Sequence, residues 1–471
     1  MQPPRKMPQH TLSSKGGDIV FNTIVLMSDQ HNPFVSSVYG HPIARTPNME
    51  RMAQRGTWFR NAWCPSPLCM PSRSAFMAGR RVHELQTYNN CNLGVCADAA
   101  SYGKTLRDGG VHTVYVGKVD AYDRGERLGF SEMLLPEDRN PPGDAQIRRR
   151  PLQVRHSAAR RADGYGVKEE AFNSDLGKVD RALRWLAETA PELGKPWTLT
   201  VNLVKPHSPQ WNTREFWERV PEGDLPRWGM SAETAQHPYA GDLRKHFCTE
   251  TFTEEQTCGL RRGYYGNVSF VDRQLGRLME AMERAGLAET TNLIYVSDHG
   301  EMLGKFGLWW KSALYEDAVR VPCFAMGPSF RSGATVATPV DLLDVRASLF
   351  RSAGAPLPAG ETGTPLQDIP ADDPKRVVFA EYHGHGTRSG AFAVRNRDWK
   401  LIWCAEAPHQ LFHLAEDPDE LRNRYEDCLP EADKLEAALR KICSPEAENE
   451  RAHEFEARQL ALLDAHRGKQ A

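Results

Sequence analysis

Long apolar runs are missing from this sequence of 471 residues. No stretch reaches the roughly 18 apolar residues that a membrane-spanning helix needs. The polar residues 1–18 lack the apolar segment of a secretory signal. We therefore expect no membrane partner and a cytoplasmic location, with residues 1–18 forming an N-terminal tail.

An excess of positive charge is missing as well. Lys and Arg number 59 and Asp and Glu 61, which gives a formal net charge of −2 at pH 7. Because a nucleic-acid backbone is held mainly by an excess of Lys and Arg, we expect no nucleic-acid partner. The 10 cysteines are too sparse for a disulfide scaffold, so most are expected to be free thiols in a reducing compartment.

Apolar segments that end in polar or charged residues predict an α/β fold. Such short, continuous runs are typical of strands buried on both faces of a parallel sheet. An amphipathic helix over residues 268–282 precedes the last of them, which is the rhythm of a doubly wound fold. Ligands bind at the carboxyl ends of such strands, so the polar residues there predict one shared cleft. The runs are residues 21–27, 113–116, 199–204 and 293–296, and a further strand is expected over 321–326.

The pattern changes after about residue 370. Four short segments with tight connections predict a small antiparallel sheet, and the Ala-, Glu- and Leu-rich sequence from Pro430 predicts helix. We therefore divide the chain into a tail (1–18), a catalytic α/β domain (19–370) and a C-terminal subdomain (371–471) with a small antiparallel sheet and a helical tail. That helical tail is a candidate interface for a homo-oligomer.

One short motif carries the strongest chemical signal. Cys69-x-Pro71-x-Arg73 resembles the modification motif of the type I sulfatases, in the alkaline phosphatase superfamily. By itself the motif also fits a buried thiol that precedes a helix with Pro71 in its first turn.

Further elements match that family in its chain order, over roughly residues 20–415. The resemblance implies an alkaline phosphatase-like doubly wound mixed sheet between helices, with a small C-terminal antiparallel α+β subdomain. It is closest to the choline sulfatase, arylsulfatase and phosphonate monoester hydrolase subtypes. The matching residues are Asp29 and Gln30, Lys118, His207, Asp298 and His299, and Lys311.

The resemblance also implies the chemistry. A formylglycine-generating enzyme would oxidise Cys69 to an aldehyde, whose hydrate attacks the sulfur of a small organic sulfate monoester. The second hydroxyl of the hydrate then lets inorganic sulfate leave as the aldehyde reforms. One divalent ion, Ca²⁺ first and Mn²⁺ or Mg²⁺ as alternatives, would be held by Asp29, Gln30, Cys69, Asp298 and His299.

The same resemblance assigns the remaining catalytic residues. Arg73 would hold the nucleophile's oxygens, and Lys118 and Lys311 would contact the sulfate oxygens. His207 would donate a proton to the leaving oxygen, because its pKa lies near working pH.

Three residues depart from common sulfatase patterns. Gln30 replaces an Asp and His299 an Asn, and Asp120 stands where the family has a His. A carboxylate would repel bound sulfate, so Asp120 is expected to turn away or to bind a cation. These departures leave two alternatives open: a phosphonate monoester or phosphodiester hydrolase with the same site, and a non-catalytic anion-binding homologue.

Other residues have two interpretations. The Arg-rich segment 136–163 is either a solvated loop or a lid that draws anions toward the cleft. Seven residues are either structural or contacts for the leaving group: Tyr88, Asn89, Asn90, Trp309, Trp310, His383 and His385.

Overall fold

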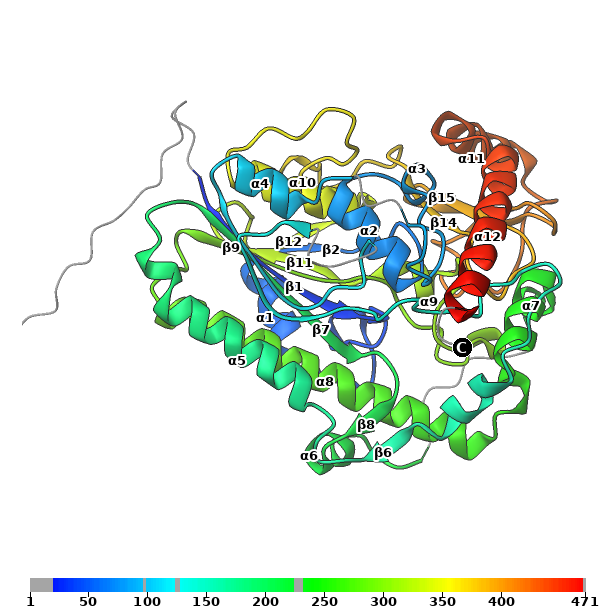
Figure 1. Cartoon of the computed structure of the whole chain (residues 1–471), viewed down its shortest axis with the longest axis horizontal. Helices are drawn as coiled ribbons and strands as arrows, with labels where there is room; N and C mark the ends of the chain where they lie inside the picture. Colours follow the sequence, from blue (N-terminus) through cyan, green and yellow to red (C-terminus); the bar gives the residue numbers. More distant parts are fainter. Residues whose placement is uncertain (1–19, 96–98, 123–127, 224–231, 469–471) are drawn as a thin grey trace, which may run out of the picture.

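An eight-stranded mixed sheet runs through the centre of the molecule, in the order β12-β2-β11-β9-β1-β7-β4-β5 (Figure 1). The computed structural model describes residues 20–95, 99–122, 128–223 and 232–468. Five consecutive strands of the sheet, β9, β1, β7, β4 and β5, are parallel, and β11 runs antiparallel to β9. The strands are β1 (Asn22–Asp29), β2 (Thr57–Phe59), β4 (His112–Lys118), β5 (Glu132–Glu137), β7 (Trp197–Pro206), β9 (Thr291–Ser297), β11 (Cys323–Met326) and β12 (Ala334–Val336).

The central strands are buried on both faces because their side chains alternate between two cores. In β1, Ile24 and Leu26 belong to one apolar cluster, whereas Val25 and Met27 belong to the other. All eight residues of β1 are buried. A sheet covered on both faces needs such continuous apolar strands, as the sequence predicted.

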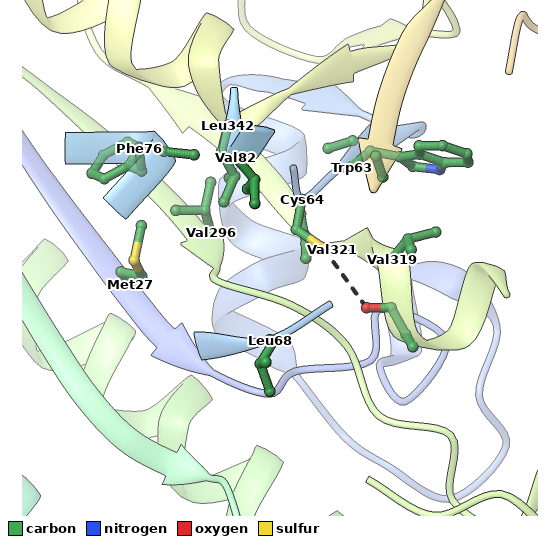
Figure 2. Packing of buried hydrophobic residues seen from close by; sticks show 14 of the residues in the cluster. Met27, Trp63, Cys64, Leu68, Phe76, Val82, Val296, Val319, Val321 and Leu342 are labelled. Atoms are coloured by element: carbon green, nitrogen blue, oxygen red, sulfur yellow. Dashed lines mark hydrogen bonds between the residues drawn. The ribbon is translucent and has the colours of Figure 1, made fainter. Parts of the chain in front are cut away.

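Helices cover the two faces (Figure 1). Side chains of α1, α5 and α8 pack in the cluster of Ile24, and those of α2, α4 and α10 pack in the cluster of Val25. Figure 2 shows part of the second cluster, where Met27, Phe76, Val296 and Leu342 meet. The helices are α1 (Pro47–Arg55), α2 (Cys69–Ala78), α3 (Val82–Leu85), α4 (Tyr102–Asp108), α5 (Asn173–Glu188), α8 (Glu254–Arg284) and α10 (Leu342–Ser352).

A separate four-stranded antiparallel sheet lies at the C-terminal end, as predicted. The helix α11 (Leu429–Ile442) packs on it, and α12 (Pro445–Gly468) returns to the larger part of the molecule. There Gln459 accepts a hydrogen bond from Asn89 (2.8 Å). The strands are β14 (Val378–Tyr382), β15 (Ala391–Arg395), β16 (Trp399–Cys404) and β17 (Gln410–His413).

Short elements complete the fold. A three-stranded sheet joins β10, β3 and β13, and a two-stranded sheet joins β6 and β8. None of the helices in the described ranges is long and apolar enough to span a membrane. These elements are β3 (Ala62–Trp63), β6 (Tyr165–Val167), β8 (Gln210–Asn212), β10 (Arg320–Val321), β13 (Val340–Asp341), α6 (Arg214–Glu218), α7 (Pro238–Phe247) and α9 (Glu316–Val319).

The predicted fold class is confirmed, with one adjustment of detail. The expected strand over 321–326 is two pieces, because Val321 pairs with β3 while Cys323–Met326 pairs with β9. The N-terminal tail at 1–18 lies outside the described residues, and the domain boundary near residue 370 stays a prediction.

Candidate active site

Two parallel strands place a pair of carboxylates side by side. In the register of β1 and β9, Ser28 is opposite Ser297, so Asp29 and Asp298 follow at the same edge of the sheet. Both are fully buried, and Asp298 Oδ1 accepts a hydrogen bond from the Gln30 amide (3.0 Å). A Cβ at Gly300 would overlap the Asp317 carbonyl, so glycine is required where the chain turns away after His299.

The N-terminus of α2 delivers position 69 to these carboxylates. Cys69 Sγ lies 3.2 Å from Lys311 Nζ and 3.4 Å from His299 Nε2. It is also 3.9 Å from Asp29 Oδ1. Pro71 is tolerated in the first turn because the amide it lacks has no partner there. The thiol predicted as the precursor of the nucleophile thus lies at the centre of the site.

Arg73 fixes this helix to the second carboxylate. Its Nε donates to Asp298 Oδ2 (2.7 Å), and its Nη1 donates to Asn202 Oδ1 on β7 (3.1 Å). One residue earlier, Ser72 Oγ donates to the Asp298 carbonyl (2.6 Å). The predicted role of Arg73 in holding nucleophile oxygens stays a prediction, because here its described bonds go to Asp298, Asn202 and the Lys118 carbonyl.

Two lysines flank Cys69. Lys118, at the end of β4, forms ion pairs with Asp29 and with Asp120. Lys311 donates to Gln30 Oε1 (2.7 Å) as well as approaching the thiol. Both lysines and His207 line one cleft, and the volume of this cleft is about 520 Å³. The sequence-predicted cationic groups are therefore brought together.

This concentration of positive charge controls the acidic groups. Burial would raise the pKa of Asp29, but Lys118, His207 and Lys311 hold it well below its usual value. Burial and Asp29 likewise raise the pKa of Cys69, while Lys118, Lys311 and His299 lower it well below 9.0. Position 69 is thus a place where negative charge is stabilised.

His207 lies in the loop after β7. Its Nδ1 donates to the Ser208 carbonyl (2.6 Å), because a carbonyl oxygen can only accept. Burial and the charge of Lys311 lower the pKa of His207 from 6.5, and Asp29 opposes that shift. The bond to Ser208 leaves Nε2 as the atom for proton exchange with a substrate.

Four side chains could hold a metal ion. The ligand atoms of Asp29, Cys69, Asp298 and His299 lie within 4.8 Å of one another. Two carboxylates and an imidazole suit Ca²⁺, Mg²⁺ or Mn²⁺, and an oxygen in place of the thiol sulfur would complete a hard donor set. The residues therefore fit the ion that the resemblance implies.

Gln30 stands beside that group with its polar atoms engaged. Its Oε1 accepts from Lys311, its Nε2 donates to Glu301, and its backbone carbonyl accepts from Tyr264 (2.6 Å). The buried Glu301 has a raised pKa, chiefly because of burial. The assignment of Gln30 as a metal ligand stays a prediction.

Asp120 binds cations of the chain itself. Its carboxylate lies 3.1 Å from Lys118 Nζ and accepts from Arg139 Nε (2.9 Å). Burial raises its pKa, but Lys118 and Arg139 reverse that shift, so Asp120 is ionised. Arg139 thus offsets the repulsion that a carboxylate beside a bound anion would cause.

The sequence analysis missed several of these partners. Glu301 follows the predicted strand 293–296, a signal that could have identified it. Asn202 lies inside the predicted strand 199–204, and neither its bond to Arg73 nor the pairing of Asp120 with Arg139 is readable from spacing. Of the seven candidate leaving-group residues, Asn90, Trp310 and His385 line the cleft, and the other four do not.

The backbone around the site adopts an unfavourable conformation at several positions. Gln30, Asp120, Trp310 and Ser312 have φ values of 70°, 45°, 66° and 78°. Non-glycine residues in this region cost about 1–3 kcal/mol each and persist only where their surroundings hold them. Two of them flank Lys311, so its position is set by a tightly constrained segment.

Comparison with known proteins decides the family. The sulfatase family model matches residues 22–355. This chain belongs to the sulfatase family. It is therefore a sulfuric ester hydrolase, and the model for the N-sulphoglucosamine sulphohydrolase C-terminal region matches residues 304–447.

Two curated relatives cover most of this sulfatase. Arylsulfatase K of Danio rerio is 27% identical, over 93% of this chain and 87% of its own length. Choline-sulfatase of Rhizobium meliloti is 28% identical, over 86% of this chain and 82% of its own.

Two solved structures share the fold. The phosphonate monoester hydrolase of Agrobacterium radiobacter has a TM-score of 0.72 at 21% identity, covering 93% of this chain and 96% of that one. A protein in complex with its substrate D-glucosamine-2-N,6-O-disulfate has a TM-score of 0.71 at 20% identity, covering 90% of this chain and 97% of that one.

The carboxylate pair predicts how metal content responds to substitution. Asp298→Asn removes one anionic ligand, so we expect affinity for a divalent ion to fall by at least about 100-fold. Elemental analysis and titration with Ca²⁺ and Mn²⁺ measure this without any activity assay. His299→Gln should weaken binding too, while Asp180→Asn, at an exposed pair with Arg277, should not. Unchanged metal content in both site variants would contradict the assignment.

Proposed function

We propose that this sulfatase hydrolyses a small organic sulfate monoester through a formylglycine made from Cys69. The observation that carries the proposal is the position of Cys69. It begins a helix, contacts Lys311 and His299, and approaches Asp29, and Lys311 lines the cleft. We further propose that a formylglycine-generating enzyme oxidises this residue. A cytoplasmic location and a homo-oligomer stay predictions from the sequence.

The electrostatics of the site support an anionic nucleophile. When present, the hydrated aldehyde supplies an attacking hydroxyl, and a divalent ion lowers the pKa of that hydroxyl. Asp29, Asp298 and His299, with Gln30 Oε1 beside them, would hold the ion, for which Ca²⁺ is proposed first and Mn²⁺ or Mg²⁺ second. The same surroundings already depress the pKa of the Cys69 thiol.

The lysines would bind the sulfate group. Lys118 and Lys311 both line the cleft, and Lys311 contacts Cys69, so an ester sulfur placed for attack would have ammonium groups near its oxygens. Charge that develops on those oxygens in the transition state is stabilised by fixed cations in a buried site. Arg73 holds α2 in register with Asp298 and thereby orients the attacking group.

His207 would protonate the leaving oxygen. Its Nδ1 is fixed on Ser208, so a protonated imidazole presents Nε2–H to the cleft. Because burial and Lys311 lower the pKa of His207, the free enzyme holds this proton less readily than an unperturbed imidazole would. Bound anionic ester would raise that pKa and favour the charged form.

Replacement of Cys69 tests the proposal. We expect Cys69→Ala to lose at least about 1,000-fold in kcat/KM on an aryl sulfate, because no nucleophile remains. Peptide mass spectrometry of the wild type should show an aldehyde at position 69. Cys64→Ala is the matched control, since Cys64 is buried in the apolar core, where it donates to the Ala318 carbonyl (Figure 2). Full activity of Cys69→Ala would refute covalent catalysis at this position.

A second candidate function uses the same residues. Gln30 and His299 depart from common sulfatase patterns, and the fold is shared with a phosphonate monoester hydrolase. Side-by-side rates on an aryl sulfate, an aryl phosphonate monoester and an aryl phosphodiester decide between them. We expect the highest kcat/KM on the sulfate, because the chain belongs to the sulfatase family. Preference for either phosphorus ester would replace the first proposal.

The role of His207 predicts a dependence on the leaving group. His207→Gln should lower kcat about 100-fold on an alkyl sulfate, whose leaving oxygen needs a proton, but far less on 4-nitrophenyl sulfate. The alkyl sulfate rate of the wild type should fall as pH rises, because the acid loses its proton. His156→Gln, at an exposed site, should change neither rate. Equal losses on both esters would exclude general acid catalysis by His207.

A further inference from the structure

The cleft has a second cationic region on the segment that the sequence analysis left open. Arg139, Arg155 and Arg161 line the same cleft as Lys118 and Lys311. Segment 136–163 is not simply a solvated loop, because Arg155 is 5% exposed. Arg148, Arg150, Arg160 and Arg161 are exposed, as a loop would have them, but of these four only Arg161 lines the cleft. Whether the segment moves as a lid stays a prediction.

Two of these arginines are neutralised by carboxylates. Arg139 is paired with Asp120, and Arg155 Nη2 lies 2.8 Å from Asp144 Oδ2. Of the other two carboxylates that line the cleft, Glu137 is paired with Lys178 at 2.6 Å. The fourth, Asp138, is exposed and accepts the Arg139 amide (2.9 Å). Ion pairs within the chain therefore neutralise most of these charged side chains in the cleft.

Arg161 is the exception. No carboxylate of the described residues lies within ion-pair distance of its guanidinium, which instead lies 5.3 Å from the ring centroid of Trp310. Trp310 immediately precedes Lys311, whose ammonium contacts Cys69. The Arg161 guanidinium therefore lies over the residue next to one that contacts the thiol. Arg155 adds a buried Nε that has no hydrogen-bond partner in the described residues.

The aromatic side chains of this region are already covered by cations. The rings of Trp310 and Phe247 lie 5.6 Å apart, with Arg161 over the first and Arg155, at 5.8 Å, over the second. A quaternary ammonium would need such an aromatic face for itself. Here it would meet guanidinium groups of the same charge.

We propose that the alcohol part of the substrate carries a second anionic group, which Arg161 binds with the help of Arg155 Nε. A carboxylate and a second sulfate share the planar or trigonal oxygen arrangement that a guanidinium recognises. The ring or chain of the alcohol packs beside Trp310 and Phe247. This inference rests on the proposed function, since it names the substrate class of the same site, and it disfavours a cationic alcohol such as choline.

A set of matched aryl sulfates tests the inference. Each has one substituent para to the ester oxygen, separated from the ring by a methylene group so that the leaving-group pKa varies little. The substituents are a carboxylate, a sulfonate, a neutral carboxamide and a trimethylammonium. We expect kcat/KM for the carboxylate or the sulfonate to exceed that of the carboxamide by about tenfold, and the ammonium ester to be the poorest.

Two variants separate Arg161 from general electrostatics. Arg161→Gln should bring the anionic-to-neutral ratio close to one, mainly through KM. Arg160→Gln removes the same charge from the neighbouring exposed position and should leave the ratio as in the wild type. A wild-type ratio near one, a preference for the ammonium ester, or equal ratios in both variants would overturn the inference.

Binding of the product alcohols gives an answer that does not need turnover. Calorimetry should show tighter binding of the carboxylate- or sulfonate-bearing phenol than of the carboxamide, and Arg161→Gln should abolish the difference. If none of the esters is hydrolysed but this binding difference is present, the proposed function fails and the anion site stands. If the esters are hydrolysed without any anion preference, the anion site fails and the proposed function stands.

Discussion

The burial of two like charges at adjacent strand ends is the constraint on which the site depends. Asp29 and Asp298 are both fully buried at the edge of β1 and β9. Buried carboxylates are tolerated only when they are paired or bind a metal ion. Arg73 compensates Asp298, and Lys118 compensates Asp29. Because each cation comes from a different element, α2 and β4 are held to the central strands by the same interactions that create the site.

The side chain at position 69 lies among these paired buried charges. The side chain there lies among Lys311, His299 and Asp29, so an anion at that point is stabilised from several directions. The strained backbone at Trp310 and Ser312 keeps Lys311 in place. The chemistry is thus built from rigid parts, whereas the leaving-group end of the cleft is built from segment 136–163 and the loop at Trp310. Recognition on loops beside a fixed scaffold is how one fold serves many substrates.

Much of this arrangement could be predicted from the sequence. The four apolar runs are strands because their side chains must fill two cores, and polar residues at the ends of parallel strands converge on one edge. Asp29, Asp298 and His299 followed from that pattern, and Cys69, Lys118 and Lys311 followed from the family resemblance. Asp120 could not be predicted, because its neutralisation by Arg139 depends on a loop whose path leaves no periodic signal.

By itself, the sequence determined the fold class, the family and the residues around the nucleophile, because these depend on local apolar periodicity and on short motifs. Only the tertiary structure decided which charges remain uncompensated. Arg161 is one of six arginines between residues 148 and 161, and nothing in their spacing distinguishes it from Arg155 or Arg160. Whether an arginine is paired, exposed or directed into the cleft depends on distances between segments far apart in the chain, and those exist only once the core has packed.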